Sequence, residues 1–217
     1  AEGDLEMSPF FIYPDLIKKT HAAGKKVMLG LGGAGTLSDN FAPMASNPAT
    51  RSKFLDNVVS FVQEHNYDGV DWDWEFPADS AEGTLYPLLV KELRERFDLI
   101  SDTLLISKAT NSSHWVGQRI EYELMIPYLD WFGIMAYDMH GAWTNHSGHN
   151  APLYAPNNDF DGSVHDAVLY LNNIRTIPID KLVMGVPFYG REFNSSGLYN
   201  SKPEDDDSTI IYSEVAA

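Results

Sequence analysis

The sequence predicts an α/β fold in which parallel strands alternate with helices. Five short runs of residues are continuously apolar, which is typical of strands buried on both faces of a parallel sheet. Amphipathic stretches separate these runs, as βα units require. The chain has 217 residues, of which 44% are hydrophobic, so it can bury a large core. No low-complexity linker divides it, and we expect one domain with an inserted module near its C-terminal end.

The elements of the first half follow from apolar spacing and from residues that begin or end helices. Gly24 ends the first helix, and Pro48 suits the first turn of a later one. In order, we expect a helix (13–23), a strand (26–31), a helix from Pro48 to His65, a strand (68–75), a helix (85–100) and a strand (103–107).

The second half repeats the same alternation around a long polar loop. Ser163 is a good N-cap for the helix that follows this loop. We expect a short helix (118–126), a strand (131–137), a helix from Ser163 to Ile174, a strand (182–186) and a short strand (209–212), with Asp205–Asp207 as a solvated turn.

Charge and composition exclude several classes of function. Fifteen basic against 31 acidic residues give a net charge of −16, which argues against nucleic acid or an anionic membrane as the main partner. No apolar run is long enough for a membrane span, and the acidic N-terminus does not read as a signal peptide. Without cysteine there is no thiol catalysis, thiolate metal site or disulfide.

Two architectures fit this alternation, an open doubly wound sheet and a (β/α)8 barrel. A doubly wound fold would place a glycine-rich phosphate turn after an early strand. The segment Gly30–Gly35 has the glycine spacing of G-x-G-x-x-G, but a lone match of this kind is a weak signal. A barrel would place its chemistry at the carboxyl ends of several strands. The unusual polar residues of this chain cluster there, which favours the barrel.

Three acidic residues at every second position of one strand are the sharpest chemical feature. In a strand, Asp71, Asp73 and Glu75 share one face at intervals of roughly 7 Å, while Trp72 and Trp74 point to the other. Buried carboxyl groups this close raise one another's pKa, so one of them should hold a proton near neutral pH. A held proton is what a general acid needs, and Glu75 lies nearest the loops.

Metal binding is the main alternative interpretation of these residues. Three carboxylates at this spacing could hold Ca²⁺ or Mg²⁺, and a solvated edge strand could also carry them. His140, His146 and His149 lie close together in the sequence, but no carboxylate is spaced to join them, so we interpret them as loop hydrogen-bonding residues. We expect no metal and no other cofactor.

The acidic strand, Asp68-Gly-Val-Asp71-Trp-Asp73-Trp-Glu75, resembles the D-x-x-D-x-D-x-E signature of glycoside hydrolase family 18, the chitinases. Other segments resemble further motifs of that family in the same order along the chain. They are Gly30–Gly33 (S-x-G-G), Met135–Gly141 (M-x-Y-D) with the loop Ser147–Tyr154, and Gly185–Arg191 (the strand-seven motif). The resemblance spans nearly the whole chain and implies a (β/α)8 barrel.

The resemblance also implies a retaining mechanism in which the substrate supplies the nucleophile. Glu75 would protonate the glycosidic oxygen, and the 2-acetamido carbonyl of the sugar would attack its own anomeric carbon. Asp73 would orient the acetamido group, with Asp71 behind it able to share a proton, and Tyr137 would hydrogen-bond the acetamido oxygen. The implied substrate-binding residues are Met135, Asp138, Trp143, Tyr189, Arg191, Gly32 and Gly33.

Two departures from the family pattern stand out. The serine of S-x-G-G is Gly30 here, which removes a hydroxyl that could support Asp71. The five expected strands correspond to strands three to seven of the barrel, so we expect an apparently incomplete barrel. Residues 1–192 would then form a partial catalytic domain, and 193–217 the start of an α+β insertion.

These features predict a chitinase that acts on chitin or chitooligosaccharides as an extracellular monomer. Three alternatives stay open: a non-catalytic chitin-binding lectin of the same fold, an inactive fragment, and a Ca²⁺-dependent structural module.

Overall fold

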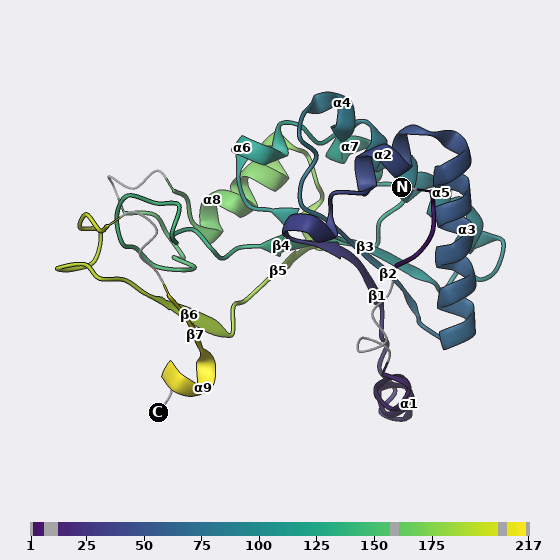
Figure 1. Cartoon of the computed structure of the whole chain (residues 1–217), viewed down its shortest axis with the longest axis horizontal. Helices are drawn as coiled ribbons and strands as arrows, with labels where there is room; N and C mark the ends of the chain where they lie inside the picture. Colours follow the sequence, from purple (N-terminus) through teal and green to yellow (C-terminus); the bar gives the residue numbers. More distant parts are fainter. Residues whose placement is uncertain (1, 7–12, 157–160, 204–207, 216–217) are drawn as a thin grey trace. The chain divides into compact units, whose positions relative to one another are not determined.

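The structure is a computed structural model that describes residues 2–6, 13–156, 161–203 and 208–215 (Figure 1). Contacts divide the chain into two compact units. Unit 1 comprises residues 1–109 and 116–132, and unit 2 comprises residues 110–115 and 133–217. The domain boundary expected after residue 192 stays a prediction, and the acidic run at 205–207 lies outside the described residues.

Five strands follow one another in chain order in one sheet. They are β1 (Leu29–Gly33), β2 (Gly69–Trp74), β3 (Leu105–Asn111), β4 (Trp131–Met135) and β5 (Leu182–Met184). β1 pairs with β2 and β2 with β3, both parallel, in a register that sets Asp71 between Gly30 and Ser107. The expected alternation of parallel strands and helices is therefore confirmed.

The helices of unit 1 begin and end at residues suited to those positions. They are α1 (Pro14–Ala22), the 3₁₀ turn η2 (Gly35–Leu37), α2 (Phe41–Ser46), α3 (Pro48–His65), α4 (Ser80–Gly83), α5 (Leu85–Asp98) and α7 (Tyr122–Met125). Pro48 occupies the first turn of α3, as expected, and the Asn47 side chain accepts a hydrogen bond from the Ala49 amide at 2.8 Å. Among the described helices, none is long and apolar enough to cross a membrane.

The core of unit 1 lies between the sheet and the helices α2, α3 and α5, which Figure 1 shows together over one face of β1–β3. Trp72 and Trp74 project from β2 into this layer, where they are fully or almost fully buried. Phe41 of α2 stacks on Trp74, and Tyr86 of α5 contacts both tryptophans. Their burial confirms a packing role for the two tryptophans.

Several strands differ in extent from the sequence expectation, and β3, expected over 103–107, runs from Leu105 to Asn111. β1 begins at Leu29 because the Asp68 carboxylate, not a backbone carbonyl, accepts the hydrogen bond from the Val27 amide. β4 ends before Asp138, whose φ of 61° leaves the extended region. β5 ends at Met184, three residues before Pro187, which cannot donate a ladder hydrogen bond.

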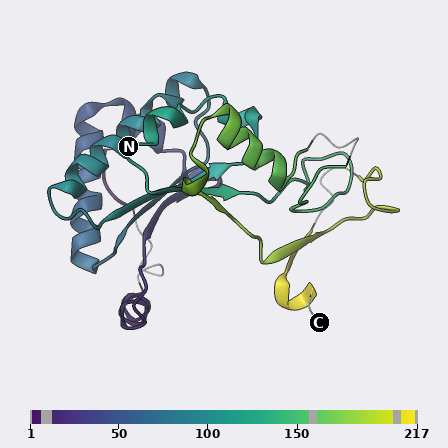
Figure 2. The ribbon, with the colours of Figure 1, turned by 180° about the vertical axis from the view of Figure 1, so that it is seen from behind.

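Unit 2 carries the second half of the alternation and an antiparallel strand pair, whose second strand was expected at 209–212 and whose pairing was not. α8 (Val164–Leu169) continues into a π-helical turn η3 (Tyr170–Ile174), and Ser163 caps it as expected, its Oγ accepting from the Asp166 amide. Short turns complete this half, α6 (His114–Gly117) and η4 (Ile179–Lys181). β6 (Tyr189–Glu192) pairs antiparallel with β7 (Ser208–Ile211), and α9 (Tyr212–Val215) follows β7 directly (Figure 2).

We expect Leu93→Ala to lower the free energy of unfolding by about 2–5 kcal/mol, because Leu93 is 0% exposed in α5 and its loss leaves a cavity. Urea denaturation followed by circular dichroism measures this change. The matched control is Leu99→Ala at the end of the same helix, where the side chain is 88% exposed and the expected change is below about 0.5 kcal/mol. Similar losses for both variants would contradict the packing described here.

Candidate active site

The two faces of β2 differ sharply in their surroundings. Asp71, Asp73 and Glu75 lie on a partly exposed face, whereas the residues between them are buried against the helices. The alternation follows from the pleat, which turns successive side chains to opposite faces. The packed tryptophans thus fix the direction in which the three carboxyl groups point.

The carboxyl end of β2 is held by groups at the end of β1. The Ser38 hydroxyl donates to the Gly33 carbonyl at 2.7 Å and accepts from the Glu75 amide at 2.8 Å. At Gly32, with a φ of 108°, a Cβ atom would lie 2.2 Å from the Asp73 carbonyl oxygen, so only glycine fits there. Gly32 and Gly33 therefore have a clear structural role at this site, and Ser38 is a positioning residue that the sequence did not reveal.

Asp71 receives its hydroxyl partner from β3. Ser107 lies beside it in the strand register and donates a hydrogen bond to Oδ1 of Asp71. Burial raises the pKa of Asp71, while the Ser107 hydrogen bond and the charge of Lys108 oppose the rise. The hydroxyl lost at Gly30 is thus supplied from the opposite neighbouring strand, which the resemblance alone did not indicate.

Asp73 is coupled to both of its acidic neighbours. Burial is the largest cause that raises its pKa, and the negative charge of Asp71 raises it further. A side-chain hydrogen bond with Glu75 and the charge of Lys108 act in the opposite direction. Asp71 and Asp73 are therefore electrostatically coupled, and burial raises the pKa of both.

Lys108 is a buried cation next to this set, and sequence reasoning missed it. Its side chain is fully buried, its ammonium donates to the Ala109 carbonyl at 2.6 Å, and it lies 4.6 Å from the ring centroid of Tyr86 and 5.7 Å from that of Tyr122. Burial lowers the pKa of Lys108 to about 7, although Asp73, Asp71 and Glu75 each raise it. The available signal was a lysine directly after the strand expected over 103–107.

A second polar cluster in unit 2 is built around Asp138. One oxygen of its carboxylate accepts a hydrogen bond from the Tyr189 hydroxyl at 2.7 Å and from the Arg191 guanidinium at 2.6 Å. Its backbone amide donates to the Asn150 side chain at 2.9 Å. Burial and the hydrogen bond to Asp138 raise the pKa of Tyr189, so this phenol stays a proton donor. The structure thus brings together three of the predicted substrate-binding residues.

The other predicted residues of unit 2 surround this cluster. Tyr137 meets the Tyr189 ring edge-on with centroids 6.2 Å apart, and Met135, two positions earlier, is the last residue of β4. Trp143 is 62% exposed, and the Arg191 guanidinium lies 4.8 Å from its ring centroid. Trp143 therefore presents an aromatic face next to the Asp138 cluster.

Coupled carboxyl groups at the carboxyl end of a parallel strand are the arrangement of a barrel-type glycosidase. The comparisons agree. The model of the glycosyl hydrolases family 18 matches residues 4–216, and the chain belongs to this family. It is 39% identical over 195 residues to "Probable chitinase 2" of Drosophila melanogaster, covering 87% of this chain and 39% of that relative.

Solved structures show the same relationship. The chitinase TsES1 from Trichuris suis superposes with a TM-score of 0.87 at 28% identity, covering 96% of this chain and 64% of that one. A Group II chitinase catalytic domain of Ostrinia furnacalis, a mutant in complex with (NAG)5, gives a TM-score of 0.80 at 31% identity, covering 88% and 54% of the two chains. The predicted fold class, an incomplete (β/α)8-like arrangement of five strands, is confirmed. The chain spans 39% of the curated relative described above.

We expect Lys108→Met to have a larger free energy of unfolding than the parent below pH about 7. This difference should shrink as the pH rises from about 7 to 10.5. The folded state holds a neutral Lys108 above pH about 7, whereas the unfolded chain keeps the proton up to pH 10.5, so the cost of the buried charge fades across this window. Urea denaturation at several pH values measures the difference from the parent.

Lys91→Met, at an exposed lysine of α5, serves as the control and should show no such trend. A pH-independent difference between Lys108→Met and the parent would show that the buried ammonium does not have a lowered pKa.

Proposed function

We propose that the protein that carries this chain is a chitinase that hydrolyses β-1,4-linked N-acetylglucosamine polymers. The row of carboxyl groups along β2 carries the proposal, because the pKa values of Asp71 and Asp73 are raised and Glu75 follows them directly at the carboxyl end of the strand. Membership of family 18 and the similarity to proteins named as chitinases support it.

In the proposed reaction Glu75 donates its proton to the glycosidic oxygen as the bond to the anomeric carbon breaks. The 2-acetamido carbonyl of the same sugar forms the new bond to that carbon, which gives an oxazolinium ion, and the leaving chain departs with the proton. Glu75, now a carboxylate, takes a proton from water, and the resulting hydroxide opens the ion with overall retention. The anomeric carbon exchanges one oxygen partner for another, so no redox partner is needed.

The neighbouring carboxyl groups have supporting roles in this proposal. Asp73 accepts the acetamido N–H and balances the positive charge that develops on the oxazolinium ion, while Asp71 exchanges a proton with Asp73. The linked titration of the two groups supports this division. Lys108 keeps the set from binding too many protons, because its charge lowers the pKa of both aspartates.

The cluster around Asp138 is the proposed sugar-binding part of unit 2. Tyr189 and Arg191 hold the Asp138 carboxylate and can offer further donors to sugar hydroxyls, and Tyr137 donates to the acetamido oxygen. Met135 lines the site, and Gly32 and Gly33 allow close approach of the backbone. The substrate is a neutral polymer found outside cells, so we propose that the protein acts there, as a monomer.

Glu75→Gln tests the proposal directly. The amide keeps the shape of the side chain but has no proton to donate, so we expect kcat/KM for a fluorogenic chitobioside to fall about 10²- to 10⁴-fold. Binding of chitooligosaccharide, measured by calorimetry, should change little. Glu95→Gln, at an exposed position of α5, is the matched control and should keep parental activity.

Equal turnover by the parent and by Glu75→Gln would overturn the proposed role of Glu75. If the parent itself binds chitin without hydrolysing it, the protein is a lectin of the same fold and the proposed function is wrong.

Trp143→Ala tests the sugar-binding surface. The exposed indole is suited to stacking on a sugar face, so we expect KM for longer chitooligosaccharides to rise about 5-fold with kcat unchanged. Steady-state kinetics with oligomers of increasing length measures this effect. Trp115→Ala is the control, since Trp115 is 71% exposed in α6 and outside the Asp138 cluster. A rise in KM for both variants would assign the effect to general loss of aromatic surface.

A further inference from the structure

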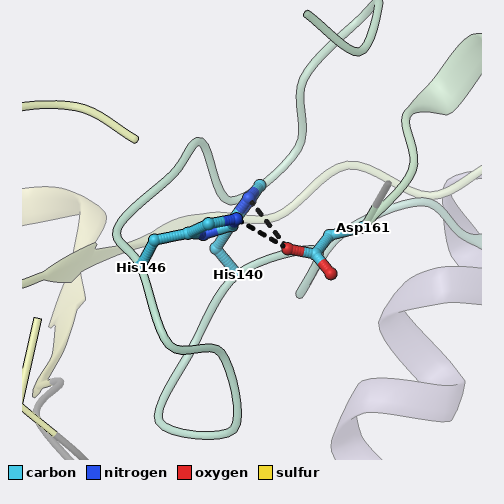
Figure 3. Close-up of side chains that lie close together, drawn as sticks. All are labelled: His140, His146 and Asp161. Carbon is cyan, nitrogen blue, oxygen red and sulfur yellow. Dashed lines mark ion pairs between the residues drawn. The ribbon is translucent and has the colours of Figure 1, made fainter. Parts of the chain in front are cut away.

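Two histidines and one aspartate of unit 2 converge in the loop between β4 and α8. His140 and His146 approach the same carboxylate oxygen, Oδ2 of Asp161 (Figure 3). The imidazole of His140 is fully buried, and that of His146 is partly buried. We define these three residues as the histidine cluster. The sequence expectation that no carboxylate joins these histidines is therefore wrong, because the loop folds Asp161 back onto them.

The distances within the histidine cluster are those of ligands around a small cation. Nε2 of His140 lies 3.5 Å and Nε2 of His146 lies 3.4 Å from Oδ2 of Asp161. Both are longer than the usual range of about 2.7–3.2 Å for an N–H···O hydrogen bond. Tetrahedral zinc with ligands at about 2.0–2.1 Å separates neighbouring ligand atoms by roughly 3.3–3.4 Å. The three ligand atoms all lie within 4.8 Å of one another, so one ion can reach them with small adjustments.

The surroundings of His140 prepare its Nε2 atom for a cation. Nδ1 lies 2.8 Å from the backbone carbonyl oxygen of His149, which can only accept, so Nδ1 carries the proton. In the neutral ring the lone pair of Nε2 then faces the Asp161 carboxylate. Metal-binding histidines commonly donate their other N–H to a backbone carbonyl in this way.

Packing holds the ring of His140 in this orientation. A Cβ atom on Gly148 would lie 2.2 Å from that ring, so the glycine backbone packs directly against the imidazole. Tyr199 contacts the rings of His140 and His146 edge-on. Nδ1 of His146 is buried and has no hydrogen-bond partner among the described residues, so a cation can select its Nε2. The first ligand is therefore rigid and the second can adapt.

We propose that the histidine cluster binds one Zn²⁺ ion through Nε2 of His140, Nε2 of His146 and the Asp161 carboxylate. Imidazole ligands favour zinc over Ca²⁺ and Mg²⁺, which prefer oxygen. A lone pair and a carboxylate that face one another repel unless a cation lies between them, and a single Zn²⁺ satisfies both imidazoles and the carboxylate. Three protein ligands leave a fourth position for water. The proposal does not depend on the proposed hydrolysis.

Bound zinc would link both ends of the loop. His140 lies two residues after Asp138, and His146 lies six residues further along the chain. Asp161 lies two residues before Ser163, the N-cap of α8. The ion therefore connects chain segments up to 21 residues apart, from 140 to 161. We expect it to stabilise the folded chain by mass action.

Titration of the full chain with Zn²⁺ in a calorimeter tests the proposal. We expect uptake of one equivalent at the cluster, a rise in Tm with zinc, and visible absorption typical of tetrahedral Co²⁺ when cobalt replaces zinc. Asp161→Asn and His146→Gln should each weaken zinc binding at least about 10-fold and abolish the rise in Tm. Asp161→Asn conserves shape, and circular dichroism confirms that each variant is folded.

His165→Gln is the matched control, because His165 is exposed on α8 and outside the cluster. It should bind zinc as tightly as the parent. The proposal is overturned if the parent takes up no zinc saturably, in which case a proton joins the imidazoles to Asp161. It is equally overturned if Asp161→Asn and His146→Gln bind zinc like the parent, which would assign the uptake to scattered surface residues.

Discussion

The desolvation of two neighbouring carboxyl groups on β2, those of Asp71 and Asp73, governs much of unit 1. Charges with restricted access to water are unstable unless other groups compensate for the lost hydration. Here a hydroxyl from Ser107, the positive charge of Lys108 and the bond between Asp73 and Glu75 provide that compensation. Each of these groups opposes the rise in aspartate pKa, and none removes it.

The same constraint accounts for the unusual backbone around the site. Carboxyl groups can be coupled only if the carboxyl end of β2 is held still, and large aromatic residues on its other face do this by packing under the helices. At the end of β1 the backbone comes so close to Asp73 that only glycine fits at position 32, and the Ser38 hydroxyl joins the two strand ends. In the proposed reaction, rigidity at this point would serve proton transfer, which depends strongly on distance and angle.

Structural features that depend on residues close together in the chain, such as strand alternation and helix ends, could be predicted from the sequence. The alternation of acid and tryptophan along β2, the proline that begins α3 and the serine that caps α8 depend only on neighbours a few residues away. Contacts between distant segments could not be predicted. Ser107 meets Asp71 through strand register, Lys108 lies next to Ser107 on the same strand, and Asp161 pairs with histidines that lie 15 and 21 positions earlier in the chain.

The loop after β4 joins the two polar clusters of unit 2 through one short stretch of backbone. The Asp138 amide bonds to the Asn150 side chain, the Met139 amide bonds to the Asn150 carbonyl at 3.0 Å, and His140 bonds to the His149 carbonyl. Asp138, Met139 and His140 are thus hydrogen-bonded to two residues later in the same loop, His149 and Asn150. A cation that fixes His140 would stiffen the same stretch that orients the Asp138 carboxylate toward Tyr189 and Arg191. In this way an ion outside the Asp138 cluster would favour a single arrangement of that cluster.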